Sequence, residues 1–175
     1  MYRVFLSLYS VLYSLLLPLY LLVFTYRALF QDKRFSSFLQ RIGKPPQIPD
    51  DTSKEHSAIR IWIHAVSVGE VKAIKPLIDA LKTEHYQLLV STVTQTGQKM
   101  ASDLFGDNAQ IFYLPLDWQW ICRRYLMSIK PKVILIAESE LWPGFIAASH
   151  SLKIPTLIVN GRVSDRSFRK YKLIP

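Results

Sequence analysis

The chain has 175 residues, half of them hydrophobic, and its 22 basic and 13 acidic residues give a formal net charge of +9. This length suits one modest domain with an appendage, and the charge indicates a polyanionic partner such as a membrane surface or a phosphorylated ligand. The single cysteine excludes an internal disulfide, and the four histidines lack the spacing of a metal-ligand set. Nucleic acid is not an expected partner, because no basic run is interleaved with aromatic residues in a recognised module.

An uncharged run covers residues 4–26. As a helix these 23 residues would be about 35 Å long, compared with a bilayer core of about 30 Å. Arg3 precedes the run and five basic residues follow it between 27 and 44, which predicts a single-pass transmembrane anchor with the rest of the chain in the cytoplasm. A helix lying on the membrane surface is the alternative, since three serines form a weak polar stripe: Ser7, Ser10 and Ser14.

Residues 27–57 have the composition of a basic, proline-rich connector, and residues 58–175 alternate between strand-like and helix-like segments. This alternation predicts βαβ units and an α/β fold with a Rossmann-like, doubly wound parallel sheet. We expect Asp117 to be the N-cap of the third helix. The predicted strands are 59–64, 87–92, 110–114, 132–136 and 156–160, and the predicted helices are 71–82, 97–105, 118–129 and 143–152, with another starting after Ser164.

In a parallel sheet the loops that follow the strands all lie at one edge, where α/β folds bind ligands. Three of the acidic residues in these loops, Glu70, Glu138 and Glu140, have the chemistry of a general base or a charge partner. Their alternative role is to stabilise the positive ends of helix dipoles. The glycines form neither a dinucleotide fingerprint nor a P-loop, so NAD and FAD are not expected.

Two further groups of residues in these loops have a functional and a structural interpretation. Arginines and serines between 162 and 169 suit a phosphate or a carboxylate, and the alternative is a solvated basic turn. Trp142 has the flat surface needed to stack on a ligand, and the alternative is an aromatic residue buried for packing.

Four segments of these loops resemble the bacterial 3-deoxy-D-manno-octulosonic acid (Kdo) transferases, which attach Kdo to the lipid A precursor. The resemblance covers nearly the whole chain, including the amino-terminal anchor. It implies a GT-B glycosyltransferase with two Rossmann-like domains, of which this chain is the amino-terminal, acceptor-binding half. The segments are WIHAVSVGEV at 62–71, YLPLD at 113–117, ESELWP at 138–143 and VNGRVSDRS at 159–167.

The resemblance also implies roles for individual residues. Glu70 would be the general base, taking the proton of an acceptor hydroxyl as its oxygen attacks the anomeric carbon of Kdo and CMP leaves. Glu140 would help to hold the acceptor or the catalytic geometry. No metal or cofactor is expected, and the donor CMP-Kdo would bind mainly to the second domain. The residues expected to bind the acceptor are Ser67, Gly69, Thr94, Glu138, Trp142, Arg162, Ser164 and Arg166.

The partners implied are the lipid A precursor (lipid IVA), CMP-Kdo and an anionic membrane surface, at the cytoplasmic face of the inner (plasma) membrane. Because the sequence stops at Pro175, we expect the donor domain to be absent and the isolated chain to be inactive. Two alternatives are a non-catalytic, membrane-tethered lipid-binding module and a GT-B enzyme that acts on another lipid-linked sugar.

Overall fold

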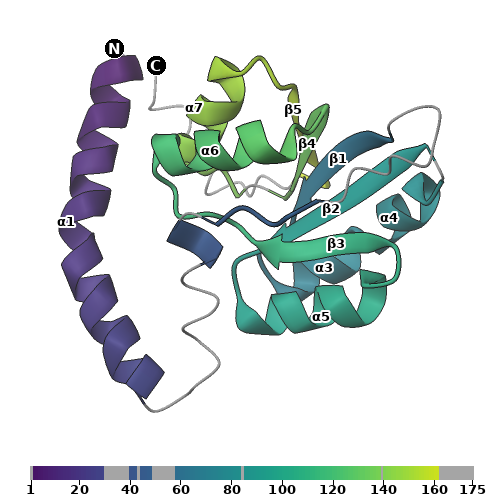
Figure 1. The fold of residues 1–175 in the computed structure, drawn as a ribbon, viewed down its shortest axis with the longest axis horizontal. Coiled ribbons are helices and arrows are strands. Elements are labelled where there is room, and N and C mark those ends of the chain that lie inside the picture. The colour runs from purple at the N-terminus through teal and green to yellow at the C-terminus, as the bar shows by residue number, and fades with distance from the viewer. Residues whose placement is uncertain are drawn as a thin grey trace. The chain divides into compact units, whose positions relative to one another are not determined.

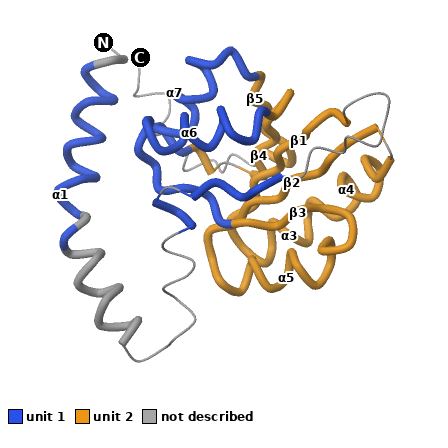
Figure 2. Tube along the Cα trace, viewed as in Figure 1, with its two compact units in different colours: residues 1–49, 113–130, 142–154 blue, residues 50–112, 131–141, 155–175 orange. Residues whose placement is uncertain are grey.

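The computed structural model describes residues 2–29, 40–42, 44–48, 58–83, 85–138 and 140–161. The chain forms two compact units, which Figure 2 shows in different colours. Unit 1 comprises residues 1–49, 113–130 and 142–154, and unit 2 comprises residues 50–112, 131–141 and 155–175.

Unit 2 is built on a five-stranded sheet with the strand order β3-β2-β1-β4-β5 (Figure 1). Strand β1 runs parallel to both of its neighbours, so that Ile61 is aligned with Leu88 of β2 and Val133 of β4, and β5 runs parallel to β4. This confirms the predicted α/β fold with a parallel sheet, and the strand order is consistent with a Rossmann-like domain. The strands are β1 (Ile59–His64), β2 (Tyr86–Thr92), β3 (Ala109–Tyr113), β4 (Val133–Ala137) and β5 (Thr156–Val159).

Strand β1 is buried on both of its faces. On one face Ile61 and Ile63 belong to a hydrophobic core with residues of α3 (Val68–Ala73), α4 (Lys75–Leu81) and α5 (Gln95–Phe105), the helices that cover this face in Figure 1. On the other face the Trp62 ring packs edge-on against Phe112 of β3, with ring centroids 5.1 Å apart. A strand packed on both sides is a rigid support for the loop that follows it.

The single helix predicted over residues 71–82 is wrong, because the structure has two helices there. Ile74 ends α3 and precedes α4, and Pro76 lies in the first turn of α4. Proline has no backbone N–H to donate and its ring clashes with the preceding turn, which favours a break in the helix at this position. Helix α3 also begins earlier than predicted, which places Glu70 in its first turn.

Unit 1 contains the helices α1 (Tyr2–Leu29), α6 (Gln119–Ile129) and α7 (Pro143–Ser151). The segment predicted to span a membrane, residues 4–26, is helical within α1. Across the residues that the structure describes, no helix combines the length and the hydropathy needed to cross a bilayer. The transmembrane anchor is therefore not confirmed.

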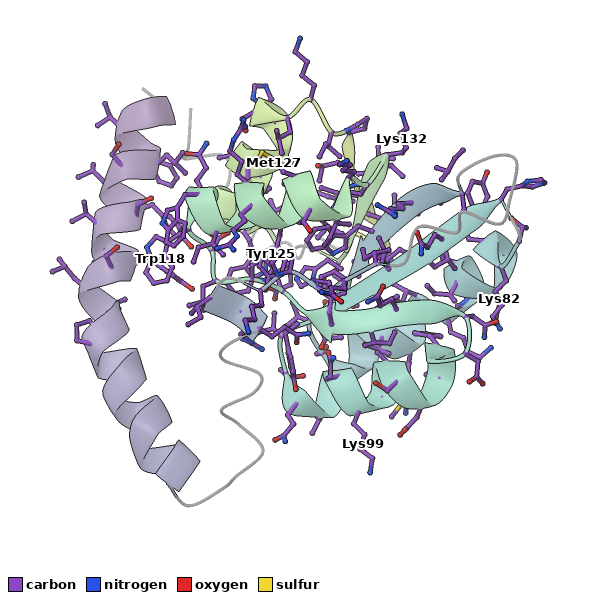
Figure 3. The ribbon with its side chains drawn as sticks, in the orientation of Figure 1. Lys82, Lys99, Trp118, Tyr125, Met127 and Lys132 are labelled. Atoms are coloured by element: carbon purple, nitrogen blue, oxygen red, sulfur yellow. The ribbon has the colours of Figure 1, made fainter. Side chains whose placement is uncertain are left out.

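Helix α1 contacts the rest of unit 1 through hydroxyl and aromatic side chains. The indole Nε1 of Trp118 donates a hydrogen bond to Ser14 Oγ at 3.0 Å, and Figure 3 shows Trp118 directed towards α1. The Trp118 ring also meets the Tyr13 ring edge-on, with centroids 5.0 Å apart. Seven large apolar side chains of α1 are exposed: Val4, Phe5, Leu8, Val11, Leu12, Leu15 and Leu16.

The prediction that Asp117 caps the third helix is wrong, because its carboxylate caps a different helix. Helix α6 has Trp118 at its N-cap, with no side-chain hydrogen bond to the helix. Asp117 instead accepts hydrogen bonds from the backbone N–H groups of Gly144 (2.9 Å) and Phe145 (2.7 Å), at the start of α7. The tight approach explains this pairing, since a Cβ on Gly144 would lie 2.1 Å from the Asp117 carbonyl oxygen.

Candidate functional site

The strand order places two distant loops beside each other. Strand β1 lies between β2 and β4. After β1 the chain passes through α3 and α4 to β2 on one side of β1, and it reaches the other side of β1 only at β4. The carboxyl ends of β1 and β4 therefore meet at the topological switch point of the sheet, where α/β domains bind ligands. Glu70 follows β1, and Glu138 and Glu140 follow β4. We name these three residues the switch-point glutamates.

Glu70 is buried, with its carboxylate held at both oxygens. Oε1 accepts a hydrogen bond from Ser67 Oγ and Oε2 accepts one from the Val66 backbone N–H, each at 2.8 Å. Ser67 is the N-cap of α3, and its Oγ also accepts from the Glu70 backbone N–H at 3.4 Å. These hydrogen bonds fix the Glu70 carboxylate in position. Because each carboxylate oxygen has two lone pairs, Glu70 can still accept a proton.

Glu138 has an unusual backbone conformation. Its φ of 57° lies in the left-handed region, which costs a residue other than glycine on the order of 1–2 kcal/mol. Its backbone N–H donates to the Val159 carbonyl at 2.9 Å, which extends the contact between β4 and β5. Strained residues of this kind cluster at functional sites, where the surrounding structure compensates for their cost.

Glu140 is influenced by both of the other switch-point glutamates. Partial burial raises the pKa of its carboxyl group, and the negative charges of Glu70 and Glu138 raise it further. Like charges have this effect only when they lie close together. The structure therefore brings the three predicted glutamates together at one edge of the sheet.

Replacing Glu70 by Gln should lower the pKa of Glu140, because the substitution removes one of the two charges that disfavour ionised Glu140. The pKa should stay above its usual value, since burial and Glu138 remain. A ¹³C NMR titration of the Glu140 side chain measures this shift. Asp79→Asn, which removes an exposed carboxylate from α4, is the matched control and should leave the titration unchanged. An unchanged Glu140 titration in Glu70→Gln would show that the two carboxylates do not interact.

The other residues predicted to bind the acceptor lie in different environments. Ser67 and Thr94 are hydrogen-bonded within unit 2, whereas Gly69 is exposed, and a Cβ there would meet Ser67 Oγ at an ordinary 3.8 Å. Trp142 belongs to unit 1, where it is half-buried as the N-cap of α7. The remaining three residues lie outside the described part of the chain: Arg162, Ser164 and Arg166.

Two residues of the site were not predicted from the sequence, Val66 and Gly97. Val66 contributes only backbone groups, and a backbone role leaves no mark on the choice of side chain. Gly97 packs against Val66, and the spacing of Thr94 and Gly97 is that of an N-cap and the N–H it binds. The role of Gly97 could therefore have been predicted from its spacing to Thr94 in the sequence.

The fold and the site define a class: an α/β domain that gathers acidic side chains at the switch point of a parallel sheet, as α/β enzymes do. Comparison with known proteins gives the family. Residues 36–175 match the family described as 3-deoxy-D-manno-octulosonic-acid transferase (kdotransferase). The chain belongs to this family, which confirms the resemblance found in its sequence motifs.

Individual relatives agree with this assignment. The chain is 39% identical to the 3-deoxy-D-manno-octulosonic acid transferase of Haemophilus influenzae over 63% of its own length and 26% of the relative. It is 28% identical to the enzyme of the same name from Chlamydia pneumoniae over 99% of its length and 39% of the relative. A bifunctional glycosyltransferase/methyltransferase of Fusobacterium nucleatum is 31% identical over 82% of the chain and 22% of the relative. The chain thus spans less than two fifths of the length of these relatives.

Proposed function

We propose that this chain supplies the acceptor site and the general base of a Kdo transferase. The reaction moves Kdo from CMP-Kdo to the lipid A precursor, lipid IVA, in lipopolysaccharide core biosynthesis. The observation that carries the proposal is the position of Glu70, a buried carboxylate held by two donors at the switch point of a Kdo transferase domain. In this proposal the domain is half of a GT-B enzyme, and the reaction uses neither a metal nor a cofactor.

The proposed step is a displacement at the anomeric carbon of Kdo. A hydroxyl of the acceptor sugar donates a hydrogen bond to a free lone pair of Glu70. As the hydroxyl oxygen forms its bond to the anomeric carbon, the bond from that carbon to the CMP phosphate oxygen breaks and the proton passes to Glu70. Such base catalysis requires the carboxylate to be fixed within hydrogen-bonding distance of the hydroxyl. The contacts from Ser67 and Val66 provide this fixation.

Glu140 has a complementary role in the proposal. We propose that Glu140, whose pKa is raised by burial and by the charges of Glu70 and Glu138, helps to hold the acceptor or the catalytic geometry. Glu138, Ser67, Gly69 and Trp142 remain candidates for contact with the acceptor. We propose that Arg162, Ser164 and Arg166 bind a phosphate of the lipid.

The proposal is tested by a transfer assay on this chain joined to the remaining length of a Kdo transferase. Labelled Kdo should pass from CMP-Kdo to lipid IVA. If lipid IVA binds and no Kdo is transferred, the chain is a lipid-binding module instead. Lipid IVA should bind more tightly than its dephosphorylated form, and equal affinities would contradict the assignment of the arginines and Ser164.

We further propose that α1 attaches the protein to the cytoplasmic face of the inner membrane. Seven large apolar side chains of α1, each more than half exposed, are available to enter lipid. The net charge of +9 suits an anionic lipid surface.

Placing charges on α1 should therefore detach the protein from membranes. The double substitution Leu8→Glu and Leu12→Glu should lower binding to phosphatidylethanolamine–phosphatidylglycerol vesicles at least tenfold, because each buried leucine contributes about 1.5–3 kcal/mol. Vesicle flotation measures the bound fraction. Met127→Glu, at an exposed apolar side chain of α6 labelled in Figure 3, is the control and should float like the original protein. Normal flotation of the double variant would exclude α1 as the membrane contact.

A further inference from the structure

The side chain of Thr94 is hydrogen-bonded within the protein. Its side-chain Oγ1 donates to the Val66 carbonyl at 3.1 Å and accepts from the Gly97 backbone N–H at 3.0 Å. The Thr96 hydroxyl donates to it as well, at 3.5 Å. A threonine hydroxyl has one donor and two acceptor positions; the donor and one acceptor are engaged by Val66 and Gly97, and the contact with Thr96 is a weak third. The contacts of Thr94 are therefore those of a structural link between two loops.

Through Val66, the link from Thr94 reaches the Glu70 carboxylate. Sheet pairing of β1 continues to Ala65, whose backbone N–H donates to the Ser91 carbonyl at 3.0 Å. The next residue, Val66, is held at its carbonyl by the Thr94 hydroxyl and the Thr94 backbone N–H. The backbone N–H of the same Val66 donates to Glu70 Oε2 at 2.8 Å. A displacement of Val66 would consequently displace the Glu70 carboxylate.

Gly97 is a second, independent indication that the loop after β2 packs closely against the loop after β1. A Cβ at this position would lie 2.8 Å from Thr94 Oγ1 and 2.9 Å from the Val66 carbonyl oxygen. Real side chains do not approach so closely, and both neighbours are fixed in a hydrogen-bonded arrangement. Glycine at position 97 therefore permits the approach of α5 to the loop that carries Glu70.

We propose that Thr94 is a positioning residue for the general base, acting through Val66 on Glu70 rather than by contact with the acceptor. The inference rests on the proposed function of Glu70. Its physical basis is that a catalytic group displaced by about 1 Å can lose on the order of 10²-fold in rate. Removing the Thr94 hydroxyl leaves the Val66 carbonyl with the longer hydrogen bond from the Thr94 backbone N–H, at 3.4 Å, and so loosens the residue whose N–H orients the carboxylate.

The test compares three variants, two that remove a hydroxyl group and one that keeps it. Thr94→Val removes the hydroxyl of the link and Thr94→Ser keeps it. Thr92→Val, at the end of β2, removes a hydroxyl that donates to Gln98 Oε1 of α5 at 2.6 Å. In the transfer assay, Thr94→Val should lower kcat about 10- to 100-fold with the KM for lipid IVA within twofold of its original value. Thr94→Ser should restore kcat to within about threefold, and Thr92→Val should match the original protein.

A second measurement is independent of activity. Hydrogen exchange of the Val66 backbone N–H in this chain should become at least tenfold faster in Thr94→Val, and it should not change in Thr92→Val. Gly97→Ala keeps the Thr94 hydroxyl and forces it away from Val66, so this variant should show the same fall in kcat even if Thr94→Val does not fold.

The outcomes separate this inference from the proposed function. A raised KM with unchanged kcat in Thr94→Val would mean that Thr94 binds the acceptor, and unchanged exchange at Val66 would mean that the link is not structural; either result overturns the inference. Full activity of Glu70→Gln would overturn the assignment of Glu70 as the base. Faster Val66 exchange in Thr94→Val would support the link between Thr94 and Val66 even then.

Discussion

Glu70→Gln is expected to lower kcat for Kdo transfer by about 10²- to 10⁴-fold, the usual contribution of a positioned general base. The fold should tolerate the change. The glutamine side-chain oxygen can accept from the Val66 backbone N–H as Oε2 does, and the side-chain NH₂ group can donate to Ser67 Oγ once that hydroxyl rotates. What glutamine lacks is an oxygen basic enough to take the proton of the acceptor.

Steady-state transfer kinetics with CMP-Kdo and lipid IVA measure this effect, and thermal unfolding checks that the variant is folded. Asp79→Asn, an exposed change on α4, is the control for loss of one negative charge and should keep its activity. Activity of Glu70→Gln within threefold of the original protein would move the base to another residue. Glu138 would then be the first residue to examine, because it lies at the same sheet edge.

The largest effect on stability is expected from Asp117→Asn, which should lower the free energy of unfolding by about 2–3 kcal/mol. Asp117 is 1% exposed, and its two oxygens accept from different backbone N–H groups at the start of α7, those of Gly144 and Phe145. Asparagine offers one acceptor and one donor group, so in either orientation its NH₂ faces a backbone N–H. The Tyr9 hydroxyl, which donates to Asp117 Oδ2 at 2.8 Å, does not relieve this conflict.

The stabilising effect of Asp117 should also depend on pH. Burial raises the pKa of Asp117 more than the hydrogen bonds from Gly144, Tyr9 and Phe145 lower it. The native protein therefore loses stability as the pH rises from the ordinary pKa of an aspartate through the raised pKa, a loss that Asp117→Asn cannot show. Urea unfolding should give a larger difference between the two proteins near pH 4 than at pH 7. Asp103→Asn, on the exposed surface of α5, should show neither effect; a pH-independent difference for Asp117→Asn would contradict the shift.

Much of the α/β domain follows from local sequence patterns. Each of the five strands lies within one residue of its predicted bounds, because short apolar runs flanked by turn residues have few alternatives in an α/β chain. Pro143 at the start of α7 was also predicted from its fixed backbone geometry. The break between α3 and α4 had a signal in Pro76, which the hydrophobic periodicity of residues 71–81 outweighed in our prediction.

The rest depends on contacts that no local pattern encodes. The sequence predicts that Glu70 and Glu140 share a sheet edge, and only the strand order shows that their loops flank the same switch point. Asp117 caps a helix that begins 26 residues later, at Pro143, instead of the helix beside it. The family resemblance implies that Thr94 binds the acceptor, and only the structure shows that its hydroxyl is hydrogen-bonded to Val66 and Gly97.

The central position of β1 also has a consequence for synthesis of the chain on the ribosome. Strand β2 follows soon after β1, but β4, which covers the other edge of β1, is made about 70 residues later, which takes on the order of 4–14 s. During this interval the nascent chain exposes an unpaired edge of β1, and such edges promote aggregation. The strand that precedes Glu70 is thus the point in the chain where a chaperone bound during synthesis would do most to limit aggregation.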